Sequence, residues 1–158
     1  MPHDAALRKQ LVQLLNSGEA HVDFGKAVAG LPAELQGKVP EGAEHSPWQL
    51  LEHMRIALWD IVKFSKDEKH KSPEWPKEYW PEQSAPQKAA DWEHSIAAYR
   101  KLIQEMSDLV SDESVDLYSK IPHGDGQTVL REALLVADHN AYHLGQLVMV
   151  RKLLGAWG

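Results

Sequence analysis

Two histidines four residues apart, His139 and His143, lie within the longest stretch of the chain that has helical periodicity. Four residues are about one turn of α-helix, so both imidazoles leave the same helix face, close enough to bind one metal ion. Two protein ligands rarely complete such a site. The best candidate for a third is His53, because it also lies in a strongly apolar helical segment, where an unpartnered polar group is costly. The sequence therefore predicts a metal site at His53, His139 and His143.

The ligand types narrow the chemistry of this site. The zinc-peptidase motif has a general-base glutamate directly after its first histidine, but Asn140 stands there, which disfavours a peptidase. No fourth protein ligand is obvious. Three neutral imidazoles leave coordination positions open, as in catalytic rather than structural sites. A divalent transition metal is expected, with Zn²⁺ or Ni²⁺ as first candidates and iron or manganese as alternatives.

Several polar residues are placed to support these ligands or to face solvent. Gln146 and Glu132 fall on the helix face of the histidine pair, and Asp60 lies on nearly the same face as His53. Each is either an orienting group for the site or an ordinary structural or solvated residue. The remaining histidines occur in polar or terminal contexts and are expected in solvent, with only the last in a turn that approaches a cavity: His3, His21, His45, His70, His94 and His123.

Length and composition predict one domain spanning residues 1–158 and exclude several functions. Cysteine is absent, which removes disulfides, thiolate nucleophiles and cysteine-type zinc sites. The 17 Lys+Arg against 23 Asp+Glu give a net charge of −6 without a basic run, so nucleic acid is not an expected partner. We find no signal core and no apolar stretch of the roughly 20 residues that a membrane span needs. A cytoplasmic protein without a membrane partner is expected.

The helical pattern predicts the frame that holds the three histidines. Four segments carry a 3.6-residue period, and none shows sustained alternation, which indicates an all-α four-helix bundle with antiparallel helices and short accessory helices between residues 19 and 45. The segment beginning at Ser46 has a complete start signal in Ser46, Pro47 and Gln49. In the third segment, apolar residues spaced by four and three form a bundle seam. The predicted helices cover residues 4–17, 46–65, 86–110 and 128–154.

An aromatic segment, residues 72–82, joins the second and third predicted helices. Its prolines forbid a helix, while Trp75, Tyr79 and Trp80 favour packing back onto the bundle. The segment is either a lid that shapes a substrate cavity or plain cover for apolar surface. Residues 111–127 form the other long connection.

These features resemble the DinB-like superfamily of metal-binding four-helix bundles, in a subgroup with a Trp/Pro-rich insertion. The motifs that carry the resemblance are Trp48–Met54 and Asp138–Gln146, on the second and fourth predicted helices. The resemblance implies that His53, His139 and His143 bind the metal. It also implies a thiol S-transferase or isomerase-like activity that uses a low-molecular-weight thiol and a small electrophilic substrate.

In the mechanism implied, a bound metal holds the thiolate, lowers its pKa and directs it at the electrophile, so no protein nucleophile is needed. The alternative is a non-catalytic metal-binding or interaction protein in which the metal stabilises the bundle. A structural site of that kind should be closed by a fourth protein ligand. Family resemblance and six tryptophans in a small chain also predict a homodimer.

Overall fold

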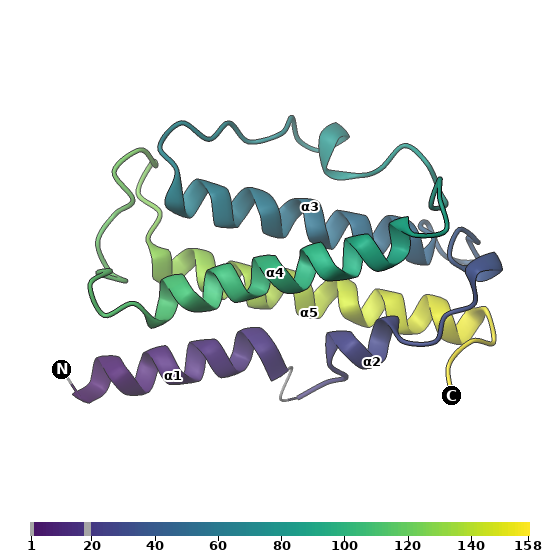
Figure 1. Ribbon diagram of the computed structural model, residues 1–158, viewed down its shortest axis with the longest axis horizontal. Helices are drawn as coiled ribbons and strands as arrows, with labels where there is room; N and C mark the ends of the chain where they lie inside the picture. The colour runs from purple at the N-terminus through teal and green to yellow at the C-terminus, as the bar shows by residue number, and fades with distance from the viewer. Residues whose placement is uncertain (1, 18–19) are drawn as a thin grey trace.

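The computed structural model describes residues 2–17 and 20–158, and the regular elements in this part of the chain are all helical. Figure 1 shows the predicted bundle of long helices, which is confirmed. Short helices occupy the region between residues 19 and 45, also as predicted. A single isolated bridge, between Lys120 and Thr128, is the β pairing found among the described residues. The elements are α1 (Pro2–Ser17), α2 (Phe24–Val28), η1 (Ala33–Leu35), α3 (Pro47–Lys66), η2 (Lys77–Tyr79), α4 (Asp91–Ser111) and α5 (Val129–Leu153).

Helix α3 begins where the sequence predicts. The Ser46 side chain accepts a hydrogen bond from the Gln49 backbone N–H at 3.1 Å, and the Gln49 side chain accepts one from the Ser46 N–H at 3.1 Å. Pro47 occupies the first helical position. This capping box satisfies donors that a helix start otherwise leaves unpaired, a contribution of about 1 kcal/mol. It thereby fixes the helical register that places His53 in the second turn.

Helix α4 starts at Asp91, five residues later than the predicted residue 86. The Asp91 carboxylate accepts a hydrogen bond from the Lys88 N–H at 2.9 Å, and the Asp91 N–H bonds to the Lys88 carbonyl at 3.0 Å. These two bonds close a turn that precedes the helix. Helix propensity and apolar periodicity do not distinguish such a turn from the first turn of the helix itself. The predicted seam is confirmed, because its residues are all buried: Trp92, Ile96, Tyr99, Ile103, Met106 and Val110.

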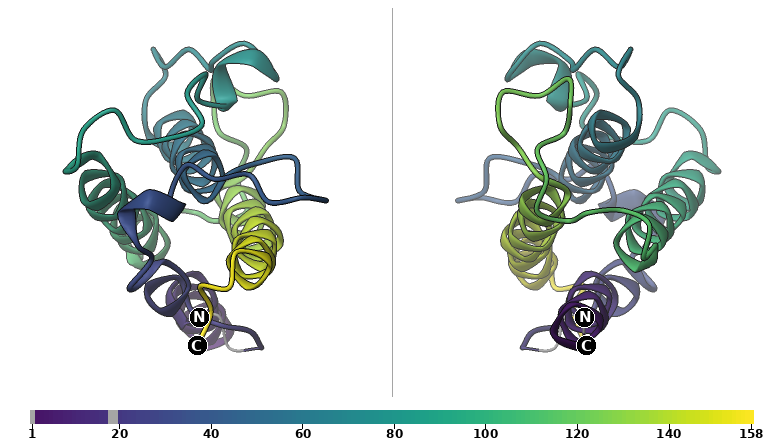
Figure 2. Two further views of the ribbon diagram at one scale, coloured as in Figure 1. Left: turned by 90° about the vertical axis from the view of Figure 1, so that its right-hand side faces the viewer. Right: turned by 90° about the vertical axis from the view of Figure 1, so that its left-hand side faces the viewer.

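The helix directions agree with the predicted antiparallel arrangement only in part, since α5 is antiparallel to α3 and α1 is antiparallel to α4 (Figure 1). Helices α3 and α4 run parallel, because the connection after α3 crosses back over the whole length of the bundle before α4 begins (Figure 1). Contacts at both ends agree: Ser95 near the start of α4 bonds to Glu52 near the start of α3, and Lys66 at the end of α3 pairs with Glu105 late in α4. Helix α3 packs against both α4 and α5, and α1 packs against α4 and α5, as the end-on views of Figure 2 also show.

The crossing segment, residues 67–90, packs onto the bundle through two of its three predicted aromatics. Tyr79 and Trp80 are half-buried against α3, as predicted. Trp75 is 69% exposed, contrary to the prediction, and contacts the Tyr79 ring edge-on rather than the helices. Among the described residues, no helix is long and apolar enough to cross a membrane.

Candidate metal centre

Three imidazoles meet between α3 and α5. The Nε2 atom of His53 lies 3.1 Å from the Nε2 atom of His143 and 3.1 Å from that of His139. Their ligand atoms all lie within 4.8 Å of one another. His53 is 1% exposed and His143 is also buried, whereas His139 is partly exposed. The structure thus brings together the residues that the sequence predicts, in a group that could hold a metal ion.

The two separations from the His53 Nε2 atom fit a transition metal. For a nitrogen to metal distance of about 2.0 to 2.2 Å, two nitrogens 3.1 Å apart subtend an angle of about 90 to 100° at the ion. That angle lies between the octahedral and tetrahedral values. The donor set is neutral nitrogen only, which suits Zn²⁺, Ni²⁺ and iron better than Ca²⁺ or Mg²⁺.

The other ring nitrogens of His53 and His143 have partners that fix which nitrogen carries the proton. His143 Nδ1 donates to the Gln146 side-chain oxygen at 2.7 Å, and His53 Nδ1 donates to the Tyr79 carbonyl at 2.9 Å. Because these partners accept, both Nδ1 atoms are protonated and both Nε2 atoms of the neutral rings carry only a lone pair. Gln146 is therefore an orienting group, one of the two roles that the sequence left open for it.

Asp60 reaches His53 through Tyr79 rather than directly. Its carboxylate accepts hydrogen bonds from the Tyr79 hydroxyl at 2.5 Å and from His70 Nε2 at 2.7 Å. Burial raises the pKa of Tyr79, and the Asp60 carboxylate adds to that effect. Both bonds hold the crossing segment on α3, which keeps the Tyr79 carbonyl against the His53 ring. The sequence predicts His70 in solvent, and this is wrong because the hydrogen bond to Asp60 holds the His70 side chain against α3.

Aromatic rings cover one side of the site. The Trp80 indole stacks on His53 with centroids 3.8 Å apart, and the His45 ring also stacks on Trp80, with centroids 3.9 Å apart. His45 is thus part of the site's surroundings, which sequence analysis missed by placing it in solvent. The position of His45, one residue before the Ser46 N-cap, could have indicated this, because it places the residue at the start of α3.

Burial keeps the three imidazoles neutral. Desolvation lowers the pKa of His53 and of His139 to about 4, with further lowering from the neighbouring histidines. Hydrogen bonds to Tyr79 and to the Asn140 side chain oppose these shifts without cancelling them. The pKa of His143 is also lowered, first by burial. The group is consequently ready to bind a cation at neutral pH without losing protons first.

Other candidate residues lie away from the centre or in solvent. Glu132 is buried and pairs with the Arg131 guanidinium at 2.7 Å. His123 is exposed, and its Nε2 atom donates to the Phe64 carbonyl at 2.7 Å. His21 and His94 are exposed, as predicted, and the side chain of His3 lies outside the described residues.

Two of the cavities that border helix α5 differ in their relation to the three histidines. The smaller, about 300 Å³, adjoins the metal centre, since its lining includes Gln146 and His45 together with apolar residues of α3 and α5 such as Leu50 and Val150. The larger, about 740 Å³, lies on another face of α5 and does not include the three histidines.

Comparison with known proteins places the chain in a family. The family model described as the DinB superfamily matches residues 18–147, a range that contains all three histidines and α3, α4 and most of α5. No curated protein and no solved structure matches the chain significantly. The match covers most of the chain, and the helical bundle agrees with it. The chain belongs to the DinB superfamily.

Proposed function

We propose that His53, His139 and His143 bind a divalent transition metal and that the resulting centre activates an external thiol for transfer to an electrophile. The observation that carries the metal proposal is the convergence of unprotonated nitrogens. His53 and His143 both use Nδ1 as the donor, so their Nε2 lone pairs face each other at 3.1 Å and cannot hydrogen-bond to each other. A shared cation turns this repulsive contact into an attractive one.

The ligand set favours a catalytic metal over a purely structural one. Among the described residues, the group of potential ligands consists of these three histidines. A structural zinc site is normally closed by four protein ligands, whereas a catalytic site keeps a position for water or substrate. Three neutral ligands also leave the full positive charge of the ion in place. We propose Zn²⁺ or Ni²⁺ as the first candidates, with iron or manganese as alternatives.

An external thiol is supported by what the chain contains and by its family resemblance. The chain has no cysteine, so a sulfur nucleophile must come from a small molecule. A metal held by the three histidines would lower the pKa of such a thiol. In the proposed transfer the thiol sulfur forms a bond to an electrophilic carbon, the leaving group departs with its bonding electron pair, and the thiol proton passes to water. The thiol must be in its reduced form, as in the cytoplasm.

The protein's own residues position this reaction rather than take part in bond making. Gln146 and the Tyr79 carbonyl aim two imidazoles, and the Trp80 indole excludes water from one side of His53. The adjoining cavity of about 300 Å³ is large enough for a small electrophile and is partly apolar.

The competing function is a non-catalytic protein in which the metal ties α3 to α5. The burial of His53 favours it, because a buried imidazole between two helices acts as a cross-link when metal is bound. Both functions share the metal, so the first experiment is elemental analysis of protein loaded with each metal in turn. We expect about one ion per chain in the wild type and a sharp loss in His53→Ala, His139→Ala and His143→Ala, with His94→Ala as an exposed control.

The second experiment separates the two functions. The loaded protein is mixed with glutathione or cysteine and 1-chloro-2,4-dinitrobenzene, and thioether formation is followed against the metal-free protein. Metal-dependent turnover that is lost in the triad variants supports the transferase. Full metal occupancy without turnover for either of these thiols supports the non-catalytic function.

A further inference from the structure

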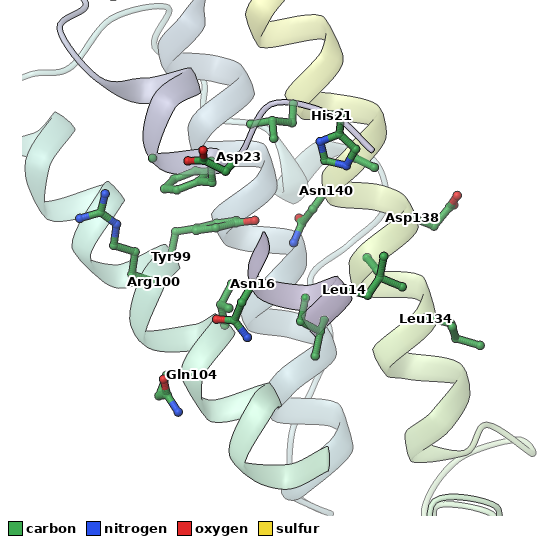
Figure 3. Close-up of a pocket in the computed structure, with 17 residues that line it drawn as sticks. Leu14, Asn16, His21, Asp23, Tyr99, Arg100, Gln104, Leu134, Asp138 and Asn140 are labelled. Atoms are coloured by element: carbon green, nitrogen blue, oxygen red, sulfur yellow. The ribbon is translucent and has the colours of Figure 1, made fainter. Parts of the chain in front are cut away.

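A cavity of about 740 Å³ lies between the end of α1, α2, α4 and α5 (Figure 3). Its walls are mainly apolar and come from all four elements, with Leu14 and Leu15 from α1, Phe24 from α2, Ile103 from α4 and Leu144 from α5. This volume falls within the range of small-molecule sites in proteins. The proposed thiol chemistry makes no use of it.

One buried polar group points into this cavity. Tyr99 is 5% exposed, and its ring stacks on Phe24 with centroids 3.9 Å apart. None of the residues that the structure describes forms a hydrogen bond with its hydroxyl group. Figure 3 shows the hydroxyl directed across the cavity toward α5, where the Asn140 amide also faces the space. The hydroxyl opens onto the cavity, so a ligand group that accepts its proton there, away from bulk solvent, gains more than the same contact gains at the surface.

The charges around the rim favour a neutral ligand. Arg100 contributes a cation, while Asp23 and Asp138 contribute carboxylates, and all three are exposed at the cavity edge. Exposed charges of opposite sign screen one another and give little net attraction to an ion. Burial also raises the pKa of Tyr99, so the hydroxyl remains a proton donor at physiological pH. The recognition group is therefore an uncharged hydrogen-bond acceptor.

We propose that this cavity is a second ligand site, for a small, neutral and largely apolar molecule whose carbonyl oxygen accepts a hydrogen bond from the Tyr99 hydroxyl. The apolar walls supply most of the binding free energy, and the hydroxyl supplies orientation. The site does not depend on the metal, since its lining residues do not include His53, His139 or His143. Three of its lining residues, Asp138, Asn140 and Leu144, are next to His139 or His143 in sequence.

The test uses two probes of almost equal shape, acetophenone and cumene, which differ in having a carbonyl oxygen or a methyl group. Binding to the metal-free full chain is measured by backbone amide chemical-shift titration at millimolar probe. Each probe is compared between wild type and Tyr99→Phe, so that the different water solubilities of the probes cancel. We expect Tyr99→Phe to weaken acetophenone binding about fivefold, the value of one hydrogen bond, and to change cumene binding less than about twofold.

Two further variants complete the test. Tyr142→Phe removes a hydroxyl from a tyrosine of α5 that is 65% exposed and does not line the cavity, and should change neither probe. Ala141→Leu fills part of the cavity and should weaken both probes. The proposal is overturned if neither probe shifts the amides of the lining residues, or if Tyr99→Phe affects the two probes equally. Amide signal dispersion confirms in each case that the variant is folded.

Discussion

The indole ring of Trp80 lies parallel to the imidazole of His53, with 3.8 Å between ring centroids and an interplanar angle of 0°. The two residues are 27 positions apart in the chain, and the crossing segment brings them together. Trp80 covers His53, and the same segment supplies the Tyr79 carbonyl to the edge of that ring. The segment is therefore cover for the metal centre as well as for apolar surface.

We expect Trp80→Ala to lower the free energy of unfolding by about 2 kcal/mol, because a half-buried aromatic ring loses its contacts with the bundle. Urea denaturation followed by circular dichroism measures this loss. Trp75→Ala is the matched control, because Trp75 is 69% exposed and its loss should cost less than about 0.5 kcal/mol. Equal losses for both variants would contradict the packing described for the segment.

Gln146→Leu should weaken metal binding by about 10- to 100-fold, since it removes the acceptor that orients His143. Isothermal titration calorimetry with Zn²⁺ measures the affinity. Gln146→Glu keeps an acceptor at the same place and should restore most of it, whereas Gln10→Leu on α1 is an exposed control. Unchanged affinity in Gln146→Leu would show that the His143 ring needs no such partner.

Metal should raise the thermal stability of the bundle, because the ion binds the folded arrangement of α3 and α5. At a free metal concentration of about 100 times the dissociation constant, the stabilisation is about 2.7 kcal/mol. Differential scanning calorimetry of loaded and chelator-treated protein measures the change. His139→Ala should abolish it, while His94→Ala should preserve it. A loaded wild type that melts at the same temperature as the metal-free protein contradicts the site.

The metal-free protein should lose stability as the pH falls from about 6.5 toward 4. The ordinary histidine pKa is 6.5, and burial lowers that of His53 and His139 to about 4, so the unfolded chain binds more protons than the folded protein in this window. The stability is thus complete above the unfolded value and decreases through the window. Urea midpoints at several pH values test this, and a His53→Gln, His139→Gln double variant should show a flatter profile.

A homodimer is predicted to form through the outer face of α5. Tyr142, Met149 and Leu153 are large apolar side chains that this face leaves exposed. Met149 and Leu153 also line the smaller cavity, so the predicted interface includes an edge of that cavity. Light scattering after size exclusion should give twice the chain mass of 17.8 kDa at micromolar concentration. Met149→Lys should shift the mass toward the monomer. A wild type that is monomeric under these conditions contradicts the prediction.

The parts of the molecule that could be predicted from sequence are those encoded locally. The Ser46 cap, the α4 seam and the one-turn spacing of His139 and His143 depend on residues within a few positions of each other. His53 was predicted to join them because a buried imidazole needs a partner, and the two helix faces do meet.

Long-range features were not predictable in the same way. Helices α3 and α4 are parallel because the 24-residue connection (67–90) returns along the bundle before α4 begins. The periodicity of the helices does not determine the path of this connection. His70 and Tyr79 meet Asp60 only because that connection folds back over α3. The packing of Tyr79 onto the bundle was predicted from its aromatic segment, but the contacts of Tyr79 and His70 with Asp60 were not.

The placement of two ligands on one turn of α5 and the third on α3 has a kinetic consequence. Local helical structure holds His139 and His143 relative to each other, whereas the position of His53 depends on the packing of α3 against α5. For the proposed ion, we expect capture to depend mainly on the pair on α5 and residence time to depend mainly on the contact between the two helices. A change at His53 should accelerate release much more than it slows capture, so the exchange rate of the metal depends on how firmly the crossing segment holds α3 in place.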